Sequence, residues 1–523
     1  MKRFNVTGIC VPEEDYMVDI SGKISQIKKL VDNRSYFTIN RARQYGKTTT
    51  LSGLEKVLNS DYIVISISFQ GLDDETFASS ENFCSKMIYL ISNSLRFSSA
   101  SPEYKEKWSR CSVAGLSSLS ERITNMCESE KVVLIIDEVD RTSNNRVFLH
   151  FIDMLRDKFS ARKAGKDFTF HSVILAGVYD VKNIKLKMIN EGLHTPTVEE
   201  GKIYNSPWNI AVNFDVDMSF SAAEIATMLN DYEADHNSGM DIVEISEEIY
   251  DCTSGYPFLV SRICQCIDEE LNKNWTPDGI REAVKILLEE KNTLFDDIFK
   301  NIRNYKKLNE FLYEMLFIGR ETAFNIDNEI INTGHMFGFL KNINGKTRIS
   351  NKIFGMRIYN YYVSENEIEA ENHQNITGIT KYEVIRNGRL NMELCLQRFA
   401  QHYGEIFAKR DIKFLERHGR LLFLSYLKPL INGYGFYHVE SEINDFRMDI
   451  VVDFNREQFI VELKIWRGEK YEQMAYEQLV NYLKIKDADT GYLLTFNFCK
   501  EANKERKAGW LDFDGKKIFE VTV

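Results

Sequence analysis

A glycine, a lysine and a threonine stand together at residues 46–48, within the stretch INRARQYGKTTTL at residues 39–51. In the pattern G-x-x-x-x-G-K-[ST], backbone N–H groups around the second glycine bind phosphate at a helix N-terminus. Lys47 would reach the β- and γ-phosphates of a nucleotide, and the Thr48 hydroxyl would bind Mg²⁺. The first glycine of the pattern is replaced by Arg41, however. The stretch alone therefore leaves open a chance lysine and threonine in a first helical turn.

A second stretch, KVVLIIDEVDR at residues 131–141, supplies the acids that a nucleotide site requires. It predicts a buried strand whose carboxyl end carries Asp137 and Glu138. Asp137 would hold Mg²⁺ through water, and Glu138 would act as general base on the attacking water. A strand that ends in two acids by chance is the alternative, but two matching pieces in the right order favour a nucleotide site. We predict ATP and Mg²⁺ as cofactors, with contacts from Arg43, Gln44, Tyr45, Gly46, Lys47, Thr48, Thr49 and Asp137.

A third stretch, RMDIVVDFNREQFIVELKIW at residues 447–466, contains Asp449, Glu462 and Lys464. Strand alternation places Glu462 and Lys464 on one face, and a hairpin would bring Asp449 onto that face too. Two carboxylates beside a lysine suit metal-assisted phosphodiester cleavage. The flanking apolar residues argue against an ordinary solvent-exposed face, although structural ion pairing remains the alternative.

The elements around these residues indicate an α/β protein of several domains. Five apolar segments alternate with helical segments, which predicts a parallel sheet covered on both faces; they lie at residues 36–39, 62–70, 131–141, 171–180 and 208–218. Helical periodicity dominates after residue 219, and the polar run at residues 364–381 is a candidate linker. The C-terminal part predicts a helix, three strands, a helix and a further strand.

The bulk composition excludes a few classes of protein. The chain has 523 residues, of which 44% are hydrophobic and 27% charged, an ordinary globular mixture. The net charge is -11, so contact with nucleic acid would depend on a local patch. The cysteines form no metal or disulfide framework, and no apolar run approaches membrane length. A cytoplasmic protein with no membrane contact is expected.

The stretches INRARQYGKTTTL, LIIDEVDR, SVILAGVYDVKN and TSGYPFLVSRI resemble the bacterial AAA-ATPase-like family, relatives of the STAND and archaeal-type ATPases, over about residues 5–300. That family often has arginine at the entry to its loop, and an arginine that meets a phosphate or an acid would offset the missing glycine. Gly255 and Pro257 resemble the G-x-P element of the family's lid helices, with a plain helix-start turn as the equal alternative. Tyr179 and Asp180 occupy the γ-phosphate sensor region, but neither is a typical sensor.

The C-terminal residues, from about 411 to 500, resemble the PD-(D/E)xK nuclease superfamily, in a subfamily fused to the AAA-ATPase-like domain. The resemblance implies that Asp449 and Glu462 bind Mg²⁺ and that Lys464 orients the nucleophile. It also implies that Glu416 completes the metal site and that Gln478 supports it, although Gln478 is also compatible with a helix surface. The proline of the superfamily's first half-motif is replaced by Met448. Neither of the nearby histidines has a partner at suitable spacing, and both are expected to be structural: His418 and His438.

Together the residues and the resemblance predict five segments: a P-loop ATPase core (1–218), a helical lid (219–300), a winged-helix-like unit (301–365), a connector (366–410) and a restriction-endonuclease-like domain (411–523). The expected function is ATP hydrolysis coupled to Mg²⁺-dependent cleavage of DNA, and the resemblance suggests defence or mobile-element biology. DNA as partner follows from the cleavage motif rather than from charge, and a homo-oligomer is left open. One alternative is a nucleotide-gated switch or scaffold whose C-terminal domain binds nucleic acid or protein without cutting. Another is cleavage that does not need ATP hydrolysis, with nucleotide only setting the oligomer.

Overall fold

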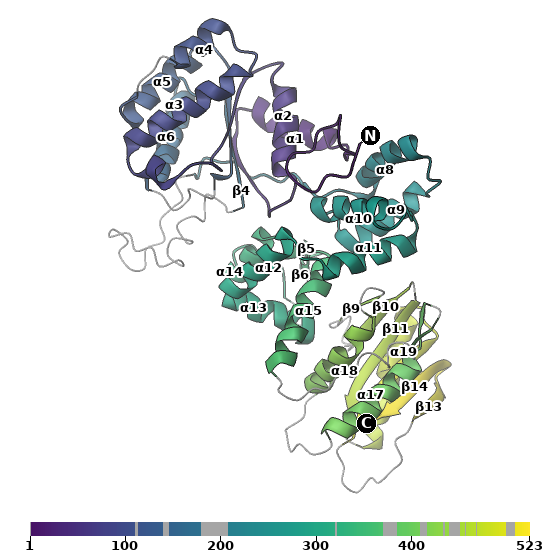
Figure 1. The fold of residues 1–523 in the computed structure, drawn as a ribbon. Helices are drawn as coiled ribbons and strands as arrows, with labels where there is room; N and C mark the ends of the chain where they lie inside the picture. Colours follow the sequence, from purple (N-terminus) through teal and green to yellow (C-terminus); the bar gives the residue numbers. More distant parts are fainter. Residues whose placement is uncertain are drawn as a thin grey trace, which may run out of the picture. The chain divides into compact units, whose positions relative to one another are not determined.

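The structure is a computed structural model (Figure 1) that describes residues 2–109, 113–139, 146–178, 208–318, 322–369, 384–386, 388–407, 416–431, 435–438, 450–455, 457–466, 468–497 and 508–523. The chain forms two compact units. The N-terminal unit comprises Met1–Tyr250, Ser254–Lys273 and Met336–Gly338. The C-terminal unit comprises Asp251–Thr253, Asn274–His335 and Phe339–Val523.

The N-terminal unit contains a four-stranded parallel sheet in the order β1-β4-β3-β2. Every residue of β3 and β4 is buried, as expected for strands with helices on both faces. The strands are β1 (Tyr36–Asn40), β2 (Ile63–Ser68), β3 (Val132–Asp137) and β4 (Ser172–Gly177). Four of the predicted strands are therefore present, close to their predicted bounds.

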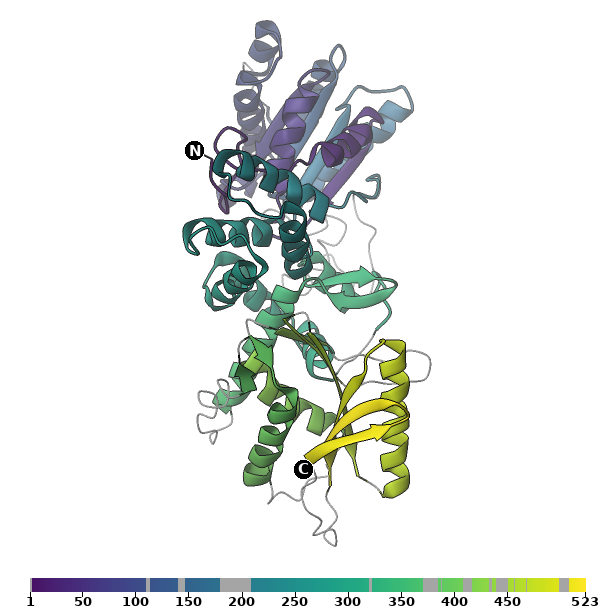
Figure 2. The same ribbon diagram turned by 90° about the vertical axis from the view of Figure 1, so that its right-hand side faces the viewer.

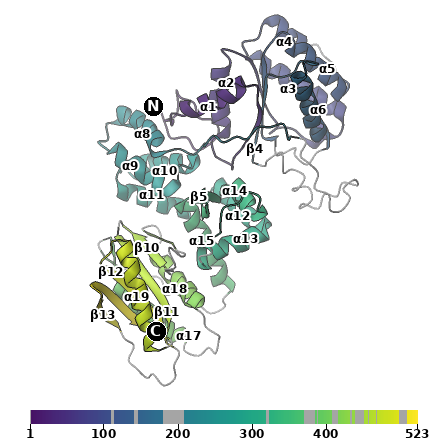
Figure 3. The same ribbon diagram turned by 180° about the vertical axis from the view of Figure 1, so that it is seen from behind.

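Helices cover the two faces of this sheet with separate apolar clusters. On one face α1 (Ser21–Asp32) and α2 (Lys47–Leu58) pack around a core that includes Ile27, Leu51 and Leu54. The other face carries a larger core built on α3 (Ser80–Arg96), α5 (Leu116–Cys127) and α6 (Arg146–Lys163), with α4 (Pro102–Ser109) and a 3-10 turn (Asp74–Phe77) beside α3. Figure 3 shows α1 and α2 on one side of β4 and α3 to α6 on the other.

The prediction of a fifth strand at residues 208–218 was wrong. This segment makes one isolated parallel bridge, between Phe37 and Val212, at the outer edge of β1. Its apolar residues are nevertheless used, because Phe214 stacks on Phe37 and Val216 is buried in the α1–α2 core. Alternating burial thus arose without a ladder of backbone hydrogen bonds. The sequence pattern could not distinguish a paired strand from an unpaired extended segment.

Three helices follow in the N-terminal unit: α8 (Ala222–His236), α9 (Ile242–Thr253) and α10 (Pro257–Glu269). Local sequence accounts for their beginnings. Ser221 and Glu224 form a capping box at the start of α8, and Asp241 caps α9 through the backbone N–H groups of Val243 and Glu244. Pro257 occupies the first turn of α10, where its missing N–H costs nothing.

The C-terminal unit begins with helices and a small hairpin. The elements are α11 (Pro277–Glu289), α12 (Thr293–Asn304), α13 (Lys306–Tyr313), a π-helical turn (Glu314–Ile318), α14 (Glu329–Met336), β5 (Leu340–Ile343), β6 (Lys346–Ile349) and α15 (Lys352–Glu369). Strands β5 and β6 pair antiparallel. Residues 301–365, for which the sequence predicted a winged-helix-like unit, contain helices, the β5–β6 hairpin and most of α15. The winged-helix assignment and the five predicted domain boundaries stay predictions.

The rest of the C-terminal unit is a six-stranded mixed sheet in the order β13-β14-β12-β11-β10-β9. Strands β11, β12 and β14 run parallel to one another, and the other neighbours pair antiparallel. The strands are β9 (Gly435–His438), β10 (Ile450–Phe454), β11 (Glu457–Ile465), β12 (Thr490–Phe496), β13 (Ala508–Phe513) and β14 (Lys516–Thr522); β7 (Ile385–Arg386) and β8 (Arg389–Leu390) form a separate small hairpin.

Helix α19 (Glu469–Ile485) covers one face of this sheet, and α17 (Met392–Phe407) and α18 (Glu416–Ile431) cover the other (Figure 2). The hairpin of β13 and β14 was absent from the sequence analysis. Asp514 and Gly515 both have positive φ at its turn, and an Asp-Gly pair between alternating residues is a strong hairpin signal that could have revealed it.

One buried lysine lies where α15, α18 and β9 meet. Lys428 of α18 is 2% exposed, and its Nζ lies 5.4, 5.6 and 5.4 Å from the ring centres of Tyr359, Phe436 and Tyr437. Burial lowers the pKa of Lys428 to about 7. Near neutral pH this amine is therefore close to half protonated.

Candidate nucleotide and nuclease sites

The phosphate-binding loop joins β1 to α2, as the sequence predicted. Gly46 is the N-cap residue of α2 with a φ of 74°, and Gln44 also has a positive φ, of 55°. Two left-handed residues so close together curl the backbone at the helix N-terminus. Such a curl presents backbone N–H groups to an anion, and the helix dipole adds to the attraction.

Lys47 and Thr48 both lie at the bottom of this loop. The Lys47 side chain is nearly buried, and its Nζ donates hydrogen bonds to the carbonyl oxygens of Arg41 and Ala42, each at 2.9 Å. The Thr48 hydroxyl donates to Asp137 Oδ2 at 2.9 Å. The fold therefore brings the two halves of the predicted nucleotide site together, although 89 residues separate Thr48 from Asp137.

Asp137 is the last residue of β3 and is itself buried. Its Oδ1 accepts a hydrogen bond from the backbone N–H of Glu138 at 2.8 Å, and Glu138 has a φ of 58°. A left-handed backbone at a residue other than glycine costs about 1–2 kcal/mol and is often found at functional sites. A carboxylate and a hydroxyl side by side are the hard oxygen ligands that Mg²⁺ prefers, so these residues fit the predicted metal.

Arg41, which replaces the first glycine of the loop pattern, forms no ion pair with an acid among the described residues. Its guanidinium donates to the carbonyl oxygens of Asn40 at 2.8 Å and Val216 at 2.7 Å, and it stacks over the ring of Phe214. Arg41 therefore links residues 208–218 to the phosphate-binding loop. The side chain thereby stabilises a loop backbone that has lost its first glycine.

Residues at the start of α10 lie against the same loop. The Tyr256 hydroxyl donates to the carbonyl oxygen of Arg43 at 2.5 Å, and the Tyr256 ring packs edge-on against Tyr45, with centroids 4.7 Å apart. Burial, with a further contribution from Asp217, raises the pKa of Tyr45 to about 12. The Tyr45 hydroxyl is therefore protonated at neutral pH. Sequence reasoning did not identify Tyr256 as part of the site.

The structure shows the G-x-P element as a helix-start turn, and its likeness to the family's lid element stays a prediction. Gly255 has a φ of 70°, and a Cβ there would stand 1.8 Å from the carbonyl oxygen of Phe220, so only glycine fits. Pro257 starts α10, and its ring lies 3.9 Å from where a Cβ on Gly46 would be. The element is a helix-start turn that also places Tyr256 and Pro257 on the phosphate loop.

A cavity of about 330 Å³ adjoins the loop. Its walls come from the N-terminal segment before α1, from the loop itself and from α8 and α10; they include Val6, Tyr16, Gln44, Tyr45, Gly46, Met228 and Phe258. Thr49 also lines the cavity, and its Oγ1 accepts a hydrogen bond from the N–H of Cys10 at 3.3 Å. No residue pattern in the N-terminal segment pointed to this wall.

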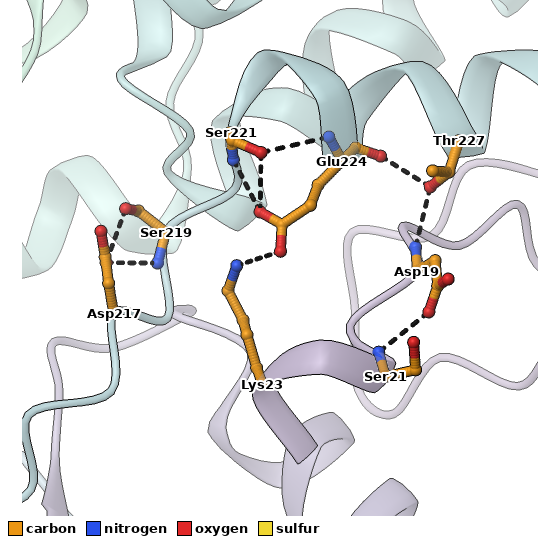
Figure 4. A network of polar contacts seen from close by, with 8 residues as sticks. All are labelled: Asp19, Ser21, Lys23, Asp217, Ser219, Ser221, Glu224 and Thr227. Carbon is orange, nitrogen blue, oxygen red and sulfur yellow. Dashed lines mark hydrogen bonds and ion pairs between the residues drawn. The ribbon is translucent and has the colours of Figure 1, made fainter. Parts of the chain in front are cut away.

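A polar network joins α1 to α8 at the edge of this cavity (Figure 4). Lys23 of α1 lines the cavity and forms an ion pair with Glu224 of α8. The other oxygen of Glu224 accepts hydrogen bonds from Ser221, and the N–H of Asp19 donates to the Thr227 hydroxyl at 2.9 Å. The helices after the sheet are therefore tied to its first helix beside the nucleotide loop.

In the C-terminal unit, Glu462 and Lys464 lie on the same face of β11, as predicted. Glu462 is fully buried, and its Oε1 lies 2.8 Å from Lys464 Nζ, whose side chain is 25% exposed. In the parallel register, Glu462 pairs with Leu493 and Lys464 pairs with Thr495 of β12. A buried carboxylate is costly unless it is paired, so the ion pair to Lys464 stabilises the charge of Glu462.

Lys464 opens into a hollow of about 220 Å³ between β11, β12 and α19. Gln478 of α19 is half-buried and lines this hollow, and its supporting role stays a prediction. The remaining lining residues are Ile465, Trp466, Tyr471, Glu472, Met474, Ala475, Leu493 and Thr495. None of these eight residues was predicted from the sequence as a site residue.

Other predicted residues fall beyond what the structure describes. Strands β10 and β11 form the expected antiparallel hairpin, with Ile450 opposite Val461, but Asp449 lies outside the described residues. Glu416 is the first residue of α18, and its side chain is not described; the same holds for the side chains of His418 and His438. Tyr179 and Asp180 are also outside the described residues. The roles of Asp449 and Glu416 stay predictions.

Neither a ready-made metal cluster nor a membrane-spanning helix is present among the described residues. Among them there is no group of three or more histidine, cysteine, aspartate or glutamate side chains able to hold a metal ion. Within the same part of the chain, every helix is too short or too polar to cross a membrane.

Comparison with protein families assigns both parts of the chain. Residues 16–276 match the family described as AAA-like domain, and residues 435–507 match the PD-(D/E)XK nuclease superfamily. The chain is therefore a hydrolase that combines a nucleotide-hydrolase domain with a nuclease-superfamily domain. In particular, an AAA-like ATPase domain is followed by a C-terminal PD-(D/E)XK domain, as the sequence resemblance had suggested.

Solved structures of low sequence identity also resemble the chain. One is the Walker-type ATPase of Pyrococcus abyssi, with a TM-score of 0.46 and 11% identity over 68% of this chain and 99% of that one. Another is the ORC2 protein of Aeropyrum pernix in its ADPNP and ADP complexes, with a TM-score of 0.39 and 12% identity over 70% of this chain and 97% of that one. A comparison with curated protein sequences found no match.

Proposed function

We propose that this protein binds and hydrolyses ATP and uses Mg²⁺ to cleave phosphodiester bonds in DNA, in defence or mobile-element biology. The observation that carries the cleavage half is the fully buried Glu462 paired with Lys464 at the wall of a hollow. Burying a charged carboxylate costs free energy of folding. Its position beside an accessible lysine is typical of a functional site, where such a cost is tolerated.

At the nucleotide site, Gly46 and the N–H groups at the start of α2 would hold the β-phosphate. Lys47 would exchange its two carbonyl partners for phosphate oxygens, a short movement because its ammonium already lies inside the loop. Thr48 and Asp137 would hold Mg²⁺, which when bound neutralises developing phosphate charge. Glu138, next to Asp137, would orient the attacking water. Arg43, Gln44, Tyr45 and Thr49 would shape the loop and the adjoining cavity.

At the nuclease site, Glu462 would bind Mg²⁺ together with Asp449 and Glu416. Asp449 precedes Ile450, which pairs with Val461 beside Glu462, and this register supports its inclusion. Lys464 would orient the attacking water and Gln478 would support it from α19. The metal, when bound, polarises the scissile phosphate and lowers the pKa of bound water.

The second candidate is a nucleotide-gated switch or scaffold with a C-terminal domain that binds without cutting. The same ion pair favours this candidate in one respect, because two neighbouring side chains of opposite charge can pair for purely structural reasons. The two candidates differ only in whether Lys464 is needed for a reaction.

The test is Mg²⁺-dependent cleavage of plasmid and single-stranded DNA, with and without ATP. Wild type is compared with Lys464→Ala and Lys47→Ala, and ATP hydrolysis is followed in parallel. We expect Lys464→Ala to lose cleavage and keep ATP hydrolysis, and Lys47→Ala to lose ATP hydrolysis. The matched control is Lys484→Ala, an exposed lysine at the far end of α19 whose partner is Asp514. Wild type that hydrolyses ATP but leaves every DNA intact would support the switch.

A further inference from the structure

The wall of the nuclease hollow that faces Lys464 is built by one face of α19. Tyr471, Met474, Ala475 and Gln478 all line the hollow, and their spacing of three and four residues places them on one side of the helix. Ala475 is buried against the sheet. The side of the helix that packs on the sheet therefore continues directly into the wall of the hollow.

Two of these wall residues are large, apolar and open to solvent. Tyr471 is 52% exposed and Met474 is 54% exposed. Trp466 lines the same hollow from the end of β11, two residues after Lys464. Exposed apolar residues scattered singly need no explanation, but here three large side chains gather around the reactive lysine. We name Trp466, Tyr471 and Met474 the apolar rim.

The charged side chains among the described residues that line the hollow are Lys464 and Glu472. Proteins that follow an intact duplex do so chiefly through lysine and arginine contacts to phosphates. A wall with flat and apolar side chains suits the faces of bases, and those faces are available only when a nucleotide is unstacked or unpaired.

We propose that the apolar rim binds unpaired nucleotides next to the scissile phosphate, so that the substrate is single-stranded or locally opened DNA. This proposal rests on the proposed nuclease function for its catalytic consequence. Its binding consequence is independent of catalysis, because stacking on the rim needs neither the metal nor the reaction. Tyr471 and Met474 act as specificity-determining residues, and Lys464 retains its catalytic role.

The binding test uses the full chain without metal, with fluorescence anisotropy at about 100 mM salt, since affinity for nucleic acid depends on ionic strength. Two labelled probes of equal length are compared: oligothymidylate, and a backbone of abasic sites with the same charge. We expect wild type to bind oligothymidylate about tenfold more tightly than the abasic probe, and Tyr471→Ala and Met474→Ala to lose most of that difference. Tyr471→Phe, which keeps the ring, should retain it.

Ile485→Ala is the matched control, because Ile485 is 52% exposed on the same helix but lies outside the hollow. Equal binding of the two probes by wild type, or an undiminished difference in Tyr471→Ala, would overturn the proposal. Cleavage separates the two hypotheses further. If wild type cuts no DNA but still binds oligothymidylate more tightly than the abasic probe, the proposed nuclease function is wrong and the proposed role of the apolar rim stands. Equal cutting of duplex and opened DNA by wild type would count against the rim.

Discussion

The nucleotide loop and the nuclease hollow hold their buried charged groups in different ways. In the loop, Lys47 is satisfied by two backbone carbonyls, and Asp137 by the Thr48 hydroxyl and a backbone N–H. In the hollow, Glu462 is held by the side chain of Lys464. The first site is organised largely by backbone, so its geometry follows from loop shape. The second is organised by a pair of side chains, so a single substitution there changes the charge balance of the site.

The largest effect expected from this difference is for Glu462→Gln. The glutamine keeps the shape of the buried side chain, and Lys464 is exposed enough to be solvated by water. The unfolding free energy should change by less than about 2 kcal/mol. Cleavage should fall about a thousandfold, because a metal carboxylate contributes several kcal/mol. Urea unfolding measures the change in stability, and initial cleavage rates measure the loss of activity. A large loss of stability with cleavage retained would show that the pair is structural.

A smaller effect concerns Lys428, a buried lysine of the C-terminal unit. Its folded-state pKa is about 7, whereas the ordinary value is 10.5, so between these values the unfolded chain binds more protons. The contribution of Lys428 to stability should therefore rise with pH, by about 2 kcal/mol from pH 7 to pH 9. Tyr437 faces it with a pKa raised well above 10.0 by burial, so that hydroxyl stays neutral throughout.

Lys428→Met removes the titrating amine and should abolish this rise. Urea unfolding of wild type and Lys428→Met at both pH values measures the difference, with Lys484→Met as the control, since Lys484 is exposed. The same pH dependence in Lys428→Met and wild type would mean that other groups produce it.

The smallest effect is expected for Tyr256→Phe. This change removes the hydrogen bond to the Arg43 carbonyl but keeps the ring against Tyr45. The lost hydrogen bond should make the binding-competent conformation of the loop less stable by about 1 kcal/mol, which corresponds to about fivefold weaker ATP binding. Isothermal titration measures it, with Tyr250→Phe on the exposed side of α9 as control. DNA cleavage without ATP should not change. Unaltered ATP affinity would show that Arg41 alone is enough to hold the loop.

The sequence predicted local chemistry better than it predicted long-range packing. Gly46, Lys47 and Thr48 are consecutive residues of a single loop. Their relative positions could therefore be predicted from the sequence pattern alone. Tyr256 could not be found this way, because its contact with Arg43 spans 213 residues. The same holds for the cavity wall before α1. Residues 208–218 were misjudged because alternating burial does not require strand pairing.

The nuclease hollow shows a different limit. Glu462 and Lys464 were predicted because strand alternation places them together. Tyr471, Met474 and Gln478 lie three or four residues apart, which is also the spacing of an ordinary buried helix stripe. Only the folded helix separates Ala475, which is buried, from Tyr471 and Met474, which are exposed.

The fastening of the phosphate loop bears on how the protein is made. Residues 41–48 leave the ribosome before their anchors do, because the carbonyl that receives Arg41 belongs to Val216 and the hydroxyl that holds Arg43 belongs to Tyr256. At about 5–20 residues per second, the interval from Arg43 to Tyr256 is on the order of 10–40 s of synthesis. During that time the nascent chain carries the complete phosphate-loop sequence without its anchors. The loop therefore gains both of its anchors only after Tyr256 has been translated.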